Sequence, residues 1–340
     1  MKTISSNFIA ILFLASPLAG MAINPQPLPP GEHQLNLPGA TTIDAPPAGF
    51  DPVNASDQDL QYFGFPPRPN QDTDPKGYAN WARAMKASKT RIVPQLEQTA
   101  ILHGSTDGLQ NAAAPTAKNA VPPPPPHDNN LVTSSMSGYY VQSGATSYGP
   151  SSVYFVETDF VVPIAQQQFG HCSGGWQYAS AWEGIDGFGS PDVLQAGIEF
   201  DAYCSGITHS SYYSAWYEWY PNGSFRISGF PIAPGDDIFV EVWHTSATQG
   251  YVYLVNNNTN QAVQIGFTAS PGYPLRGNSA EWIVEDANAL VNFGFIPFWD
   301  AVAYTESGVQ YCSTSGTQVV NIGPPALSPF PMGTCSFVVH

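Results

Sequence analysis

Short runs of alternating apolar and polar residues fill the chain after residue 130. They are rich in β-branched and aromatic residues, and turn residues separate them at short intervals. Alternation with a period of two indicates strands, and many short strands indicate a sandwich or jelly roll. The pattern predicts an all-β fold, an antiparallel β-sandwich of the jelly-roll or concanavalin-like kind. The clearest runs are SVYFVETDFVV, YASAWEGID, VLQAGIEF, YYSAWYEWY, DIFVEVWH, YVYLVNN, AVQIGF, AEWIVE, DAVAYTE and CSFVVH.

A different pattern precedes this region. The proline run within 121–130 is an extended spacer, which does not belong to a packed core. Before it, Ser56 can cap a helix through Tyr62, residues 78–89 fit a helix, and Pro94 can open a third helix to Leu102. We therefore divide the chain into a small, partly helical pro-segment (23–120), a proline-rich linker (121–130) and a β-sandwich domain (131–340).

The first 22 residues have the pattern of a secretory signal peptide. Lys2 precedes a short apolar run from Phe8 to Leu18, and small residues follow it. The run is too short to span a membrane. We expect cleavage after residue 22 and a secreted, extracellular protein, with an uncleaved anchor as the alternative.

Charge is divided unevenly between these parts. The whole chain has a formal net charge of −16, which disfavours nucleic acid and anionic membranes as partners. Residues 131–340 contain two Lys or Arg against sixteen Asp and Glu, whereas 76–91 contain five basic residues and no acidic one. A basic helical segment on an acidic domain predicts an inhibitory lid that leaves when the carboxylates protonate at low pH. The alternative is a solvated basic helix without such a role.

Four cysteines suit an exported protein with two disulfides. No C-x-x-C spacing is present, so we expect neither a zinc site nor another metal or cofactor. Three pairings are possible, and we favour the two that are nearest in sequence, Cys172–Cys204 and Cys312–Cys335.

Polar and aromatic residues share one face of several predicted strands. In 194–200 the apolar face should pack on the core, and the other face carries Gln195, Gly197 and Glu199. Gly197 leaves room for an approaching backbone. In 280–286, Glu281 and Glu285 lie on one face. Together the strands predict a groove for an extended polymer, lined by Trp182, Asp186, Gln195, Glu199, Trp216, Glu218 and Glu285.

Two chemistries suit such a groove. Two carboxylates that flank a bond would cleave or bind glycans. A carboxylate paired with an amide suits attack of water on a peptide carbonyl, with the carboxylate as general base and the amide as oxyanion donor. The chain has no G-x-S-x-G, H-E-x-x-H, P-loop or G-x-G-x-x-G motif.

Five motifs, in order, resemble the eqolisin family of glutamic peptidases. They are AWEGIDG (181–187), LQAGIEF (194–200), AWYEWYP (215–221), PGDDI (234–238) and AEWIVED (280–286). The resemblance implies a β-sandwich endopeptidase that is made as a zymogen and works at acid pH. Its partners would be protein or peptide substrates and its own pro-segment as an intramolecular inhibitor. We expect a monomer.

The resemblance also implies roles for single residues. The catalytic glutamine falls on Gln195, and the catalytic glutamate falls on Glu285, which we prefer to Glu281. We expect Gln195 and Glu285 to meet across neighbouring strands with room for one water. Supporting or groove positions fall on Trp182, Asp186, Glu199, Trp216 and Glu218. Glu183 departs from the family, whose members commonly have Val at this position.

Overall fold

The computed structural model describes residues 31–99, 130–133, 136–167, 170–190, 192–286, 291–322 and 327–340. The predicted signal peptide lies outside the described residues, as does the proline run of the linker. Their boundaries therefore stay predictions. Among the described residues, no helix is long and apolar enough to cross a membrane.

Two large β-sheets make up the described part of the chain, so the all-β prediction is confirmed. One sheet has eleven strands in the order β1-β2-β15-β14-β13-β7-β17-β21-β20, with β3 beside β15 and β18 beside β17. Their bounds are β1 (Glu32–Gln34), β2 (Ala40–Ile43), β3 (Thr90–Ile92), β7 (Val153–Val161), β13 (Asp237–Ser246), β14 (Gln249–Asn256), β15 (Gln261–Thr268), β17 (Ile296–Thr305), β18 (Gln310–Cys312), β20 (Pro329–Gly333) and β21 (Ser336–Val339).

The second sheet has ten strands in the order β4-β12-β11-β10-β9-β16-β6-β19-β5, with β8 beside β10. Their bounds are β4 (Gln95–Gln98), β5 (Asn130–Thr133), β6 (Met136–Gln142), β8 (Gly175–Gln177), β9 (Ala179–Asp186), β10 (Val193–Ser205), β11 (Thr208–Trp219), β12 (Ser224–Ser228), β16 (Ser279–Asp286) and β19 (Gln318–Ile322). Strand pairs are antiparallel except β3 with β15 and β5 with β19.

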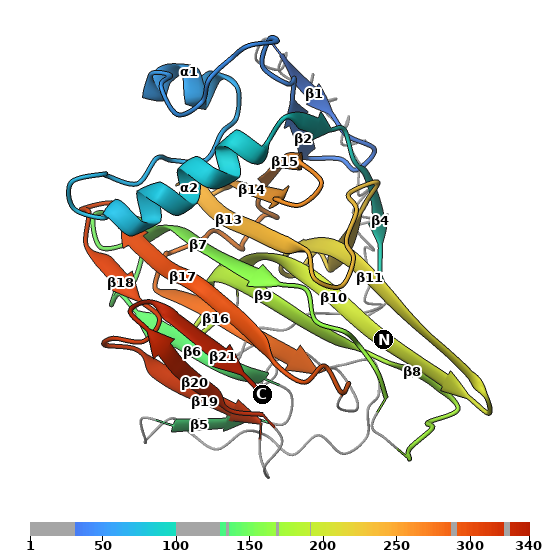
Figure 1. Ribbon diagram of the computed structural model, residues 1–340. Helices are drawn as coiled ribbons and strands as arrows, with labels where there is room; N and C mark the ends of the chain where they lie inside the picture. The colour runs from blue at the N-terminus through green and yellow to red at the C-terminus, as the bar shows by residue number, and fades with distance from the viewer. Residues whose placement is uncertain are drawn as a thin grey trace, which may run out of the picture. The chain divides into compact units, whose positions relative to one another are not determined.

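The main core lies between the two sheets. Figure 1 shows β7 and β17 in one layer and β9, β10 and β16 in the other. The face of β10 that was predicted to be apolar packs into this core: Leu194, Ala196, Ile198 and Phe200 are buried. Alternation along β10 therefore turns its other face, with Gln195 and Glu199, away from the core between the sheets.

Residues 31–99 pack against the sandwich through two helices and four short strands. Ser56 caps α1 (Asp57–Tyr62), as predicted, and α2 (Pro75–Ala87) begins three residues earlier than expected. The third predicted helix, over 94–102, is wrong because β4 forms there and pairs with β12. Strand pairing with a distant segment overrides the local helix signal of Pro94.

A second apolar cluster joins these helices to the outer face of the eleven-stranded sheet. Trp81, Met85 and Phe65 are buried there against Phe239 and Tyr253. Full burial of large side chains stabilises the contact by about 2 kcal/mol per side chain. Residues 31–99 are therefore an integral part of the folded chain.

Basic residues of α2 reach acidic residues of the same sheet. Arg83 binds Asp159 at 2.9 Å and Asp237 at 2.6 Å, and Lys76 pairs with Asp300. The basic helix thus lies on the sheet that does not carry the predicted groove, so the helix itself is not a cover over the groove.

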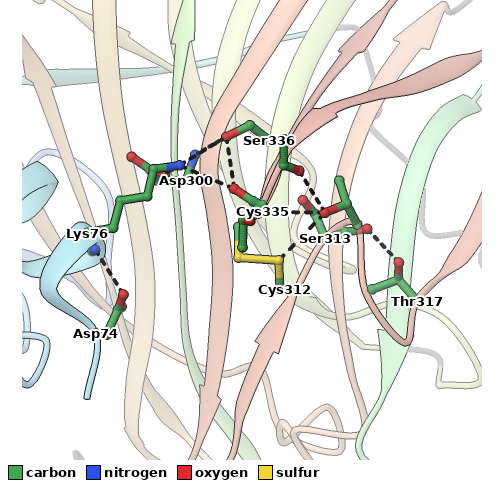
Figure 2. Close-up of a disulfide and its surroundings, with 12 residues drawn as sticks. Asp74, Lys76, Asp300, Cys312, Ser313, Thr317, Cys335 and Ser336 are labelled. Carbon is green, nitrogen blue, oxygen red and sulfur yellow. Dashed lines mark hydrogen bonds and ion pairs between the residues drawn. A yellow bond between two sulfur atoms is a disulfide. The ribbon is translucent and has the colours of Figure 1, made fainter.

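Both predicted disulfides are present, Cys172–Cys204 and Cys312–Cys335. Figure 2 shows the second one beside the contacts that hold α2. Lys76 donates to the carbonyl of Thr334 at 3.2 Å, next to Cys335. The disulfide therefore fixes a loop that anchors the N-terminal segment.

Candidate active site

Register places the polar face of the ten-stranded sheet in rows that run across the strands. In one row, Glu218 lies opposite Gln195, Gln195 opposite Gly184, and Gly184 opposite Glu281, followed by Tyr140. Directly opposed residues point to the same side of a sheet. Five strands, β11, β10, β9, β16 and β6, thus contribute one residue each to a continuous polar row.

A parallel row carries the other predicted acidic residues. Glu199 lies opposite Ser180, and Ser180 lies opposite Glu285. Between the two rows stand Trp216, Gly197, Trp182 and Ile283. The predicted groove residues of these strands therefore share one face, which we call the site face.

The two rows separate the residues that were expected to meet. β10 and β16 are not neighbours, because β9 lies between them. Gln195 and Glu285 also differ by four positions along the strands, which puts their Cα atoms roughly 16 Å apart. Gln195 and Glu281 share a row, with a Cα separation of about 10 Å across two strand spacings. The expectation that Gln195 faces Glu285 across neighbouring strands is wrong, and the register favours Glu281.

Glycine at position 184 keeps the space between Gln195 and Glu281 open. A Cβ atom there would lie 3.0 Å from the Cβ of Gln195 and 3.1 Å from the carbonyl oxygen of Leu194. Two side chains of this length, reaching toward each other over about 10 Å, leave room for a small molecule such as water. An amide and a carboxyl group on either side of one water have the composition needed for hydrolysis.

Neighbouring polar groups orient the side chains of the site face. The Nε2 of Gln195 donates to Oε2 of Glu218 at 3.3 Å, and the hydroxyl of Ser279 donates to Oε1 of Glu281 at 3.5 Å. The indole N–H of Trp182 donates to Oε2 of Glu285 at 3.2 Å. The Trp182 indole therefore supports Glu285, the carboxylate of the second row.

Close backbone approach explains another glycine of the site face. A Cβ atom at Gly197 would lie 2.1 Å from the carbonyl oxygen of Ala181, so only glycine fits. The prediction that Gly197 admits a neighbouring backbone is confirmed. The approaching backbone is that of β9, which carries Trp182.

Asp186, a predicted groove residue, binds the backbone of a turn. Its carboxylate accepts hydrogen bonds from the backbone N–H groups of Arg276, Gly277 and Asn278 at 2.7, 3.0 and 2.6 Å. Burial raises its pKa, and these donors oppose that rise. Asp186 has a φ of 66°, a conformation that is rare for a residue with a side chain. It holds the turn that leads into β16.

Acidic crowding continues along β10. Burial raises the pKa of Asp201 to about 9, and the charge of Glu199 adds to the rise. Asp201 and Glu199 are two positions apart on β10, so their side chains point to the same side of the sheet. At this end of the site face, Asp201 therefore favours its protonated form.

Two aromatic residues of the site were missed in the sequence. Tyr140 ends the first row and stacks on Phe188, with ring centroids 3.9 Å apart. They belong to a small apolar cluster with Met136, Trp182, Trp216 and Ile283. Alternation in 136–142 was the available signal, because it puts Met136 and Tyr140 on one face. Among the described residues, no group of three or more His, Cys, Asp or Glu could hold a metal ion.

Comparisons with known proteins identify the family of the chain. The Peptidase A4 family model matches residues 137–326, more than half of the chain, and the chain belongs to this family. The fold of this chain is an all-β sandwich with a polar row across one face of one sheet.

Two curated relatives are similar to this chain. Aspergillopepsin-2 from Aspergillus niger is 38% identical over 151 residues, which cover 42% of this chain and 51% of the relative. Scytalidopepsin B from Scytalidium lignicola is 37% identical over 163 residues, which cover 45% of this chain and 60% of the relative. The chain thus spans about half to three fifths of the length of these relatives.

Two solved structures are also similar to this chain. A scytalido-glutamic peptidase with a transition state analog inhibitor is 27% identical, with a TM-score of 0.49, over 62% of this chain and 98% of that chain. The aspergilloglutamic peptidase from Aspergillus niger is 33% identical, with a TM-score of 0.42, over 48% of this chain and 97% of that chain.

Proposed function

We propose that this protein is an endopeptidase that hydrolyses peptide bonds with Gln195, Glu281 and one water. Membership of a peptidase family supports the reaction class. The observation that carries the residue assignment is the shared row of Gln195, Gly184 and Glu281. The expected partner Glu285 becomes a supporting residue beside Trp182.

The reaction needs only these two side chains and water. Glu281 takes a proton from the water, and the resulting hydroxide adds to the scissile carbonyl carbon. The side-chain N–H of Gln195 donates to the oxyanion of the tetrahedral intermediate. Glu281 then returns the proton to the leaving nitrogen as the C–N bond breaks. No metal or other cofactor enters these steps.

The hydrogen bond from Gln195 to Glu218, its neighbour in the same row, has a role in this reaction. An amide whose Nε2 is held by Glu218 cannot rotate freely, so its remaining N–H keeps one direction. A fixed donor costs little reorganisation during the reaction. Glu218 is therefore a positioning residue for the oxyanion donor.

Acid pH suits this protein. Its β domain holds two basic residues against sixteen acidic ones, so self-repulsion grows as carboxyl groups ionise. The pKa of Asp201, raised to about 9, belongs to the same trend. Substrates are unfolded proteins or peptides that can lie extended across the site face.

The full-length chain fits a secreted precursor. Gln195 and Glu281 are 0% exposed in it, so a substrate cannot reach them without a change in the chain. Cleavage in the linker, whose proline-rich composition is typical of a spacer, would produce the active form, in which residues 31–99 stay paired with β12 and β15. Incubation near pH 3–4 should yield a fragment that begins between roughly residue 120 and residue 140.

Three single variants test the assignment. Proteolysis of a denatured protein at acid pH, with chelator and serine reagents present, is measured for Gln195→Ala, Glu281→Gln and Glu285→Gln. Loss of one oxyanion donor should cost about 10²–10³ in rate, and Glu281→Gln should abolish turnover. Glu285→Gln should keep measurable activity. Full activity in Gln195→Ala or in Glu281→Gln would overturn the proposal, and cleavage of a glycan instead of protein would favour the carbohydrate alternative.

A further inference from the structure

His244 is buried and makes an unusual pair of contacts. Its Nε2 lies 2.7 Å from the carbonyl oxygen of Val153, and its Nδ1 lies 3.0 Å from the carbonyl oxygen of Ser246. A carbonyl oxygen can only accept a hydrogen bond, and a neutral imidazole has only one N–H. Both contacts are hydrogen bonds only when the ring carries two protons.

A bulge creates this arrangement. The register of β13 with β14 shifts between His244 and Ser246, so the carbonyl of Ser246 turns back toward the ring. The other acceptor, Val153, is the first residue of β7. The ring thus joins the end of β13 to the start of β7.

Hydrogen bonds lead from Val153 to the candidate active site. The N–H of Val153 donates to the carbonyl of Gly277 at 2.8 Å, and the N–H of Gly277 donates to Asp186. Asp186 also binds the N–H of Asn278, the residue before β16. Glu281 follows three residues later, so these contacts end next to the strand that carries the base of the proposed reaction.

Close packing makes this connection rigid. A Cβ atom at Gly277 would lie 2.6 Å from both the Cβ of Ser152 and the carbonyl oxygen of Val153. The hydroxyl of Ser152 donates to the carbonyl of Arg276 at 2.6 Å. The turn before β16 therefore cannot shift without moving the strand that His244 holds.

Charged and aromatic groups surround His244. Asp186, below it on the ten-stranded sheet, is buried and interacts with its charge. Tyr148 packs edge-on against the ring at 5.3 Å and donates to Glu306. The other ionisable groups nearby are Arg276, which pairs with Asp192, and Asp57, Arg68, Tyr154 and Tyr251, which line the same cavity as His244.

We propose that His244 is an imidazolium that holds β7 and the turn before β16 in place, and so fixes Glu281 relative to Gln195. His244 is then a positioning residue for the reaction proposed above, and this part of the inference rests on that function. The protonation of the ring stands on its contacts alone. Loss of the second ring proton would leave one of the two carbonyl oxygens without a donor.

Ring spectra of the full-length chain with ¹⁵N-labelled histidine test the protonation state. At pH 7 an imidazole in an unfolded chain is mostly neutral, so the same protein unfolded in urea is the control. We expect protons on both ring nitrogens of His244 in the folded protein and a single ring N–H in the unfolded control. A single ring N–H on His244 at pH 7 would overturn the proposal.

Kinetics of His244→Gln and His244→Phe test the positioning role, with His209→Gln as the matched control. We expect kcat on an unfolded substrate to fall about tenfold or more in His244→Phe, with KM little changed, because small displacements of a catalytic group are costly. His244→Gln, which keeps one donor nitrogen, should lose less. Folded His244→Phe with the parent kcat would refute the positioning role, and the ring spectrum remains decisive if this variant fails to fold.

The two proposals can fail separately. Full proteolysis by Gln195→Ala would overturn the proposed reaction and with it the positioning role of His244. The spectrum does not depend on turnover. Two ring protons at pH 7 would therefore support the imidazolium even in that case.

Discussion

Gln195 and Glu281 lie in one row of the ten-stranded sheet, separated only by Gly184. In the proposed reaction, the missing side chain at position 184 lets the amide of Gln195 and the carboxyl group of Glu281 approach one water from two sides. Ala at this position would place a methyl group 3.0 Å from the Cβ of Gln195 and push it by a few tenths of an ångström.

We therefore expect Gly184→Ala to lower kcat about tenfold or more, because misplacement of a catalytic group is costly. Gly175→Ala is the matched control, since a Cβ atom there meets nothing within 4 Å. Proteolytic rates of the two folded variants check the prediction. Equal, undiminished rates would mean that the space over position 184 does not matter.

Glu183 is a carboxyl group inside the sandwich. It is fully buried, on the face of β9 that points toward the other sheet, and burial raises its pKa well above the usual value. The charges of Glu157 and Asp159 add to the rise. The folded state favours the protonated form of Glu183. The free-energy cost of burying this carboxyl group is therefore absent at low pH, and it grows as the pH rises above the ordinary pKa of glutamate.

Glu183→Gln should therefore stabilise the protein by roughly 1–3 kcal/mol at pH 7 and change little at pH 4. Urea unfolding at the two pH values measures the difference. Asp72→Asn, at an exposed position, should show no such dependence. A stabilisation of the same size at both pH values would contradict the argument.

Arg83 is the cation that faces Asp159 beneath α2. Burial raises the pKa of Asp159 to about 8, and the charge of Arg83 acts in the opposite direction. The pKa of Asp159 in the folded state is above the ordinary value for aspartate. Burial of Asp159 beneath α2 is therefore favoured at acid pH and becomes unfavourable as the pH rises toward 8. For this group, acid pH holds the helix in place, contrary to the expectation of a lid that leaves at low pH.

Arg83→Ala should cost roughly 1–3 kcal/mol at pH 8, where the buried carboxylate loses its partner, and less at pH 4. Lys86→Ala is the control on the same helix, because Lys86 is exposed. Thermal unfolding of both variants at the two pH values checks the sign. A larger loss for Arg83→Ala at pH 4 than at pH 8 would refute it.

The Cys312–Cys335 disulfide lies in the loop that accepts Lys76 of α2 (Figure 2). Replacing both cysteines with Ala should cost about 3 kcal/mol and should speed amide hydrogen exchange in residues 75–87. The control is the double Ala variant of Cys172–Cys204, a bridge of similar span at the other end of the domain. Equal exchange of α2 in both variants would show that this disulfide does not anchor the helix.

Strand faces could be predicted from the sequence because alternation is a local property. Gln195, Glu199, Trp216 and Glu218 were all placed on one face, and the register agrees. Register itself is not local. Whether Glu281 or Glu285 stands in the row of Gln195 depends on the strand between them and on the loops that set its position.

Other differences between the sequence prediction and the structure also arise from contacts between distant parts of the chain. Nothing near Pro94 indicates that Gln95–Gln98 pairs with β12, more than a hundred residues away. The cysteine pairs are the ones favoured for their short separation in sequence, although that separation alone left two other pairings open. The contacts of His244 arise from a bulge in β13, and no motif indicates it.

Residues 31–99 add β4 to β12 at the edge of the ten-stranded sheet, and they add β2 and β3 to β15 at the edge of the eleven-stranded sheet. A shortened protein that began at residue 130 would present both edges as unpaired backbone to other molecules. Such edges recruit strands from neighbouring chains. Recombinant production of the sandwich without its N-terminal segment should therefore give aggregated protein, and co-expression of residues 31–99 as a separate chain should recover it in soluble form.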